Sequence, residues 1–154
     1  LNTKHMKFKT IFILSLAFIM SCSKDDSSSN SNSNITSSLT CKIDGAAFSA
    51  SNISATNVSG STLISGVNSS SGVKLIQFTI TEGSKGEVNL GDGDLGQYGI
   101  GTDLFNTNVS QNAVGKVNIT TNDLTSIQGS FSFDAVNNTG KIVKITDGKF
   151  VVKK

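Results

Sequence analysis

Short runs of alternating apolar and polar residues fill the chain between positions 39 and 154. In residues 73–81 (VKLIQFTIT), the apolar side chains of Ile76, Phe78 and Ile80 alternate with polar ones. Successive side chains of a strand point to opposite faces, so this run predicts a strand with one buried and one solvated face. No part of this region repeats apolar residues with the 3.6-residue period of an amphipathic helix.

A second run, residues 127–135 (IQGSFSFDA), shows the same alternation. Ile127, Phe131 and Phe133 fall on one side, and polar residues fall on the other. Strands with one solvated and one buried face are typical of antiparallel sheets. We expect the buried faces to meet in one core. Its aromatic members should be Phe48, Phe78, Phe131, Phe133 and Phe150.

Glycine-containing turns separate these runs. Asp44-Gly45 and Asp147-Gly148 readily adopt the positive φ angles of a two-residue hairpin turn, so we expect a hairpin at each. The turn spacing predicts an all-β domain over residues 39–154, built as an antiparallel β-sandwich or flattened barrel of about nine or ten short strands. Longer loops are expected at residues 69–72, 82–86 and 137–140.

The first 21 residues have the order of a bacterial secretory signal peptide. Lys7 and Lys9 form a positive n-region, residues 11–20 (IFILSLAFIM) form an apolar h-region, and Ser21 precedes Cys22. This apolar segment is too short to cross a bilayer core of about 30 Å. We therefore expect residues 1–21 to be removed and not to remain as a transmembrane helix.

The residues around Cys22 resemble two bacterial sorting signals. Residues 19–22 (IMSC) are similar to the lipobox, which implies cleavage before Cys22 and a diacylglycerol anchor, with acyl chains such as palmitate, on that cysteine. The next residues resemble the tag that sends lipoproteins of Bacteroidota to the outer face of the outer membrane, with a periplasmic orientation as the alternative. The tag residues are Lys24, Asp25 and Asp26.

A Ser/Asn-rich segment follows this tag. Residues 27–38 (SSSNSNSNITSS) contain too little apolar surface to offset the entropy lost on folding. We expect residues 22–38 to form a flexible tether between the lipid and the β domain.

Charge and composition exclude several functions. The chain carries a formal net charge of +2, but from Cys22 onward it has ten lysines and eleven acidic residues, a net charge of −1. The histidine, His5, lies in the predicted signal peptide, and arginine and tryptophan are absent. We expect no nucleic-acid partner, because no basic excess remains to neutralise phosphates. Cys41, left without a partner cysteine, is expected to be a small buried apolar residue.

An acidic glycine-rich segment is the one candidate for metal binding. Residues 91–96 (GDGDLG) match the letters of a dinucleotide-binding loop, but the two aspartates would repel a pyrophosphate and no helix follows. Asp92 and Asp94 could instead offer oxygen ligands to Ca²⁺, with Asp103 or Glu87 completing the shell. The alternative is an ordinary acidic turn without a metal.

The sequence offers no recognisable catalytic machinery. Downstream of Cys22 there is no histidine and no GxSxG motif, and no two aspartates are singled out as an acid–base pair. We expect no enzyme activity and no cofactor. Tyr98, flanked by glycines in residues 96–101 (GQYGIG), is a possible ligand contact, because its ring would be exposed there. The alternative is a ring packed on its own sheet.

Several short blocks resemble an uncharacterised lipoprotein domain family of Bacteroidota. This resemblance implies an all-β fold and an extracytoplasmic location, and it brings no assigned catalytic residues. The blocks are residues 41–48 (CKIDGAAF), 115–123 (GKVNITTND), 127–133 (IQGSFSF) and 145–150 (ITDGKF).

These observations favour a lipoprotein at the cell surface with a non-catalytic role in binding, adhesion or as an accessory module. One alternative is a lipocalin-like carrier that holds a small apolar ligand inside a flattened barrel. A carboxylate-dependent hydrolase is a further alternative. An internal cavity would favour the carrier, and a converging pair of aspartates would favour the hydrolase.

Lipidation of Cys22 is directly testable. Mass spectrometry of the membrane fraction should find an N-terminal peptide that begins with acylated Cys22, and no peptide from residues 1–21. An unmodified N-terminus downstream of Cys22 would contradict the lipobox interpretation. Cys22→Ala should abolish both the cleavage and the membrane association.

Overall fold

The computed structural model describes residues 34–91 and 93–154. The predicted signal peptide, Cys22 and the tag residues Lys24, Asp25 and Asp26 lie outside the described residues. The described residues form strands joined by turns, with one short 3₁₀ segment, η1 (Val109–Gln111). The strands are β1 (Ser38–Ile43), β2 (Ala46–Ser49), β3 (Asn52–Val58), β4 (Ser61–Asn68), β5 (Lys74–Thr81), β6 (Gly86–Leu90), β7 (Gly96–Ile100), β8 (Asp103–Asn106), β9 (Gly115–Asn122), β10 (Ser126–Val136) and β11 (Ile142–Lys153).

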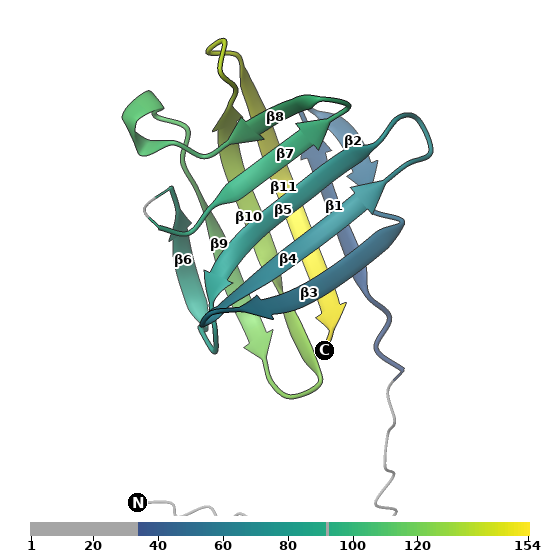
Figure 1. Ribbon diagram of the computed structural model, residues 1–154. Helices are drawn as coiled ribbons and strands as arrows, with labels where there is room; N and C mark the ends of the chain where they lie inside the picture. The colour runs from purple at the N-terminus through teal and green to yellow at the C-terminus, as the bar shows by residue number, and fades with distance from the viewer. Residues whose placement is uncertain (1–33, 92) are drawn as a thin grey trace, which may run out of the picture. The chain divides into compact units, whose positions relative to one another are not determined.

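The strands form one curled antiparallel sheet. Its order is β2-β1-β11-β10-β8-β7-β5-β4-β3, and β9 pairs with both β10 and β6. The sheet folds over so that β3, β4, β5, β7 and β8, here called the front layer, cross in front of β1, β9, β10 and β11, the back layer (Figure 1). The result is an open half-barrel, which confirms the predicted all-β class. Within residues 34–91 and 93–154, no helix is long and apolar enough to span a bilayer.

The core lies between the two layers and is rich in phenylalanine. Phe78 of the front layer packs on Phe131 and Phe150 of the back layer, with ring centroids 4.9 and 5.3 Å apart. The predicted inward residues of β5 and β10 are all buried, as is each phenylalanine predicted for the core. In the described part of the chain, every buried side-chain nitrogen or oxygen has a hydrogen-bond partner.

One of the two predicted hairpins is confirmed, and the other is wrong. Asp44 (φ 48°) and Gly45 (φ 84°) form the tight turn between β1 and β2. Asp147 (φ 54°) and Gly148 instead lie inside β11, where the pairing register shifts against β10 and against β1. Asp-Gly supplies a positive φ angle, which a β-bulge can use as well as a hairpin.

Gly148 is required at the bulge by its neighbour across the sheet. A Cβ atom at position 148 would lie 2.5 Å from the carbonyl oxygen of Phe131 and 2.6 Å from its ring. The absent side chain therefore makes room for Phe131, and the bulge allows β11 to continue to Lys153 as one strand.

Cys41 is a buried core residue, as the sequence predicts. It lies on β1, is 5% exposed, and packs with the apolar cluster that contains Phe48. Burial raises the pKa of its thiol from 9.0 to about 12, because a thiolate is poorly solvated in an apolar environment.

The alternation in β10 predicts a sharp contrast between neighbouring substitutions. Phe131→Ala or Phe133→Ala should lower the free energy of unfolding by about 3 to 5 kcal/mol, because each removes buried area and leaves a cavity. Ser132→Ala, on the opposite face and half-buried, should stay within about 0.5 kcal/mol of the parent protein. Denaturant titration followed by circular dichroism measures all three. An equal loss for Ser132→Ala would show a strand buried on both faces.

The raised thiol pKa predicts a loss of stability at alkaline pH. Between pH 9 and 12 the folded Cys41 keeps its proton while the unfolded thiol loses it, so the free energy of unfolding falls as pH rises through this range. Cys41→Ala should fall less steeply over the same pH range. Parallel curves for the two proteins, measured by denaturant unfolding, would contradict this assignment.

Candidate binding trough

A shallow trough runs over the outer surface of the back layer. It consists of two overlapping depressions of about 530 and 500 Å³. Both depressions are lined by Lys116 of β9, Ser132 of β10 and Thr146 of β11. The trough therefore spans neighbouring strands and faces away from the core.

The shape of the trough follows from side-chain size along β10. Ser130 and Ser132 are short residues on the outer face of β10, and they form its floor. Lys116 pairs with Ser132 on one side, and Lys149 pairs with Ser130 on the other. These longer side chains form the walls. The register shift at the β11 bulge sets both Thr146 and Asp147 against Ser132, which adds an extra residue to that wall.

Ion pairs between strands place charges of both signs around the trough. Lys116 Nζ lies 3.0 Å from a Glu87 carboxylate oxygen of β6. Asp147, in the bulge, pairs with Lys42 of β1 at 2.9 Å. The partners are largely exposed, so each pair adds at most about 1 kcal/mol to stability. Their main effect is to fix where the charges lie.

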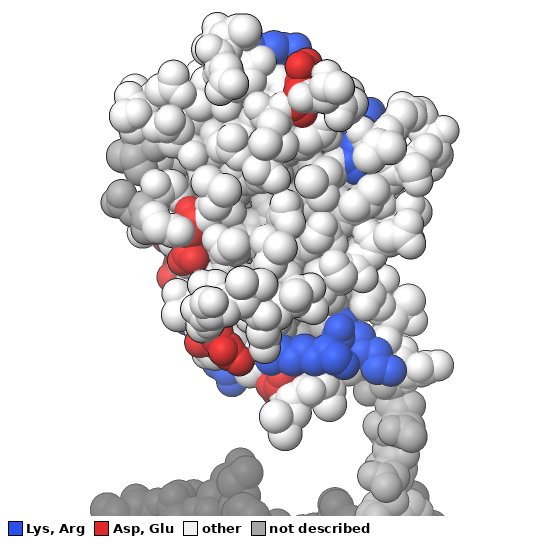
Figure 2. Space-filling model, in the orientation of Figure 1, with Lys and Arg blue, Asp and Glu red and all other residues white. Residues whose placement is uncertain are grey.

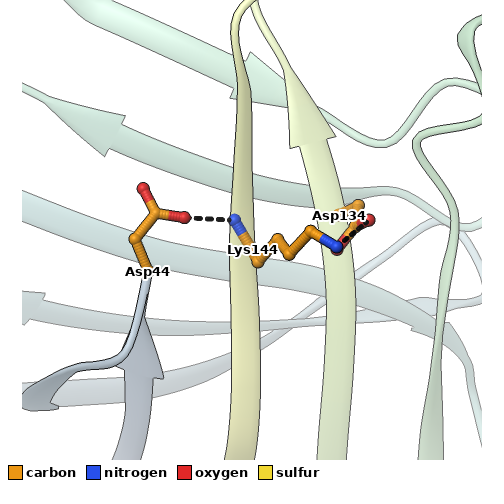
Figure 3. Close-up of polar contacts among 3 residues, drawn as sticks. All are labelled: Asp44, Asp134 and Lys144. Carbon is orange, nitrogen blue, oxygen red and sulfur yellow. Dashed lines mark hydrogen bonds and ion pairs between the residues drawn. The ribbon is translucent and has the colours of Figure 1, made fainter.

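Lys144 connects the trough to the β1–β2 turn. Its backbone N–H donates to Asp44 Oδ1 at 2.9 Å, and its ammonium lies 3.9 Å from an Asp134 oxygen (Figure 3). The Asp44 N–H donates in turn to the Lys144 carbonyl at 2.9 Å. Lys144 thus lies between two aspartates, one from the β1–β2 turn and one from β10.

Free polar groups remain along the trough. Among the described residues, Lys149 has no ion pair, and Asn118, Ser130 and Ser132 make no side-chain hydrogen bond within the protein. An ammonium, an amide and two hydroxyls can therefore donate to a ligand, and the amide and hydroxyls can also accept. This combination suits a polar ligand that lies along the surface.

The ring of Tyr98 is not exposed, contrary to the expectation from its flanking glycines. It is 4% exposed and lies in β7, facing the core, with its ring centroid 5.7 Å from that of Phe105. Burial raises the pKa of the Tyr98 hydroxyl, and the nearby Asp44 and Cys41 raise it further. The ring therefore packs inside its own sheet, and the trough does not include it.

The candidate calcium ligands are only partly described. Asp92 lies outside the described residues. Asp94 is half-buried, burial raises the pKa of its carboxyl, and its carbonyl accepts a hydrogen bond from the Gly91 N–H. In residues 34–91 and 93–154, no group of three or more His, Cys, Asp or Glu side chains is placed to hold a metal ion.

The remaining aspartates take structural positions. Asp123 accepts from the backbone N–H groups of Thr125 and Ser126 at 2.8 and 2.9 Å in the β9–β10 turn, which lowers the pKa of its carboxyl. Asp44 caps a turn, as predicted. Asp134 lies within β10, in the run predicted as a strand, whereas Asp147 lies within β11 and not in the predicted hairpin turn.

A lipocalin-like carrier would hold its ligand in a cavity between the two layers. The space between the layers contains tightly packed side chains such as Phe78, Phe131 and Phe150. The two depressions of the trough open on the outside of the sheet instead. The alternation in the sequence predicts only that Ser130 and Ser132 face solvent. It does not predict the trough, because the trough also depends on the residues of β9 and β11 beside these serines.

The chain matches a known protein family. Residues 35–152 match a family described as a domain of unknown function (DUF6252). No curated protein and no solved structure matches the chain. The matched region covers most of the chain, from before β1 to the penultimate residue of β11. The chain therefore belongs to the DUF6252 family.

Proposed function

We propose that this protein is a lipoprotein anchored in the outer membrane through Cys22 and facing the cell exterior, and that its β domain is a non-catalytic binding module. The sequence order supports the anchor, because the positive n-region, the apolar h-region and Ser21-Cys22 follow one another directly. The residues after Cys22 support surface display, since Lys24, Asp25 and Asp26 resemble an export tag.

The trough carries the proposal of a binding role. Its floor of serines and its walls of lysine, asparagine and threonine offer donors and acceptors along a surface path across β9, β10 and β11. A hydroxyl-rich chain such as a polysaccharide fits this chemistry, because its hydroxyls can donate and accept along their whole length. Charges of both signs beside the path allow neutral and weakly acidic chains to bind.

The predicted tether is consistent with a bulky ligand. A Ser/Asn-rich segment of this composition lets a domain turn relative to its anchor, so the trough could align with a polymer held outside the cell. A shallow trough gives weak binding per site, and many anchored copies would raise the overall affinity through multivalency.

Filling the trough should weaken ligand binding. Ser132→Tyr places a ring over the trough floor, and it should reduce binding to immobilised polysaccharides at least about tenfold, the loss expected from one or two hydrogen bonds. Thr102→Tyr, in the exposed β7–β8 turn, is the matched control. A panel of neutral and acidic polysaccharides, screened with the intact protein, measures both variants. Equal binding by the two variants, or no binding to any polysaccharide, would overturn this assignment.

A further inference from the structure

The outer surface of the front layer differs from the trough side in having no charged side chains at its centre. The strand pairing arranges its outward residues in rows that cross the layer. The middle row contains only amides and hydroxyls, which are Ser54, Ser65, Gln77, Gln97 and Asn106. The row on one side is Thr56, Leu63 and Thr79. The row on the other is Asn52, Val67, Leu75, Gly99 and Leu104.

We call these three rows the neutral face. Figure 2 views the front layer and shows white atoms over its centre, with blue and red atoms toward the margins. The trough side, in contrast, carries ion pairs on β1, β6, β9, β10 and β11. The difference begins in the sequence, because residues 46–81 contain a single charged residue, Lys74.

The neutral face has an apolar corner. Leu104 is 47% exposed and Val73, which directly precedes β5, is 57% exposed. The Val73 carbonyl accepts from the Gly101 N–H at 3.2 Å, which places the loop before β5 beside the β7–β8 turn. Leu75 and Leu104 approach each other over Gly99, where an added Cβ would lie 3.5 and 3.6 Å from them. Exposed apolar side chains grouped in this way are typical of contact surfaces.

The chemistry of the neutral face limits what can cover it. A partner that brought a charge onto this surface would lose its hydration and find no opposite charge in return. Amides and hydroxyls, however, act both as donors and as acceptors, so two copies of the middle row can satisfy each other. Depletion of charged residues at the centre is one part of the compositional signal of protein–protein interfaces.

We propose that the neutral face is the contact surface between two copies of this chain, related by a two-fold axis. In such an isologous contact the same residues meet from both sides, so the apolar corner and the middle row of one copy meet those of the other without any charge being buried. The trough lies on the opposite layer. A dimer formed through the neutral face would therefore leave both troughs open and facing outward.

Cross-linking in intact membranes tests this contact. Gln77→Cys places a thiol in the middle row of the full-length chain, and a bis-maleimide matched to the roughly 10 Å between packed sheets should link two copies into a covalent dimer. Ser132→Cys, on the trough side, is the matched control, and the parent chain measures any reaction at Cys22 or Cys41. We expect the dimer yield at Gln77→Cys to exceed that of both controls at least tenfold.

Charge introduced on the neutral face gives an independent test. Leu104→Asp or Thr79→Asp, each in the Gln77→Cys background, should lower the dimer yield at least tenfold because each buries two carboxylates in the contact. Resistance to trypsin, compared with the parent protein, reports whether each variant is folded. A yield at Gln77→Cys equal to that at Ser132→Cys would overturn the proposal, as would products that contain a different protein. Any dimer from the parent chain comes from a thiol at Cys22 or Cys41 and is subtracted from both yields before they are compared.

Discussion

The packing of Phe131 against Phe78 and Phe150 is the contact on which the rest of the domain depends. Phe78 belongs to the front layer, while Phe131 and Phe150 belong to the back layer, and the ring centroids lie 4.9 to 6.3 Å apart. Aromatic rings bury large apolar areas and pack in tilted or edge-on pairs. The curled sheet has free edges, so strand pairing does not close it into a barrel. The packed rings hold the two layers together instead.

This packing also shapes the surface that we propose for binding. Phe131 occupies the space that a side chain at position 148 would need, so that position is glycine. The bulge at Asp147 accompanies this glycine and turns the aspartate outward, where it pairs with Lys42. Thr146 and Asp147 then both oppose Ser132 and form part of the trough wall. The inner face of β10 and β11 thus determines the outline of their outer face.

The fold class and the core could be predicted from the sequence, because alternation in a strand is a local property. Phe78, Phe131 and Phe133 are buried as their spacing indicates. Errors arose where a residue's environment depends on distant strands. The Asp147-Gly148 pair specifies a positive φ angle but not whether the chain turns back, and the glycines beside Tyr98 do not reveal that Phe105 covers its ring. The trough could not be predicted, since its walls come from strands that the sequence does not show to be neighbours.

Apolar side chains of the described residues pack between the two layers, and the two outer surfaces of the sheet differ in charge. Charged side chains remain hydrated beside a shallow trough and can exchange water for a polar ligand at little cost. On the neutral face there are no charges whose desolvation would oppose a close contact. The neutral face therefore favours a contact that excludes water, against another uncharged surface. The trough favours a hydrated contact with a polar ligand. Both can operate together, because they lie on opposite layers of the half-barrel.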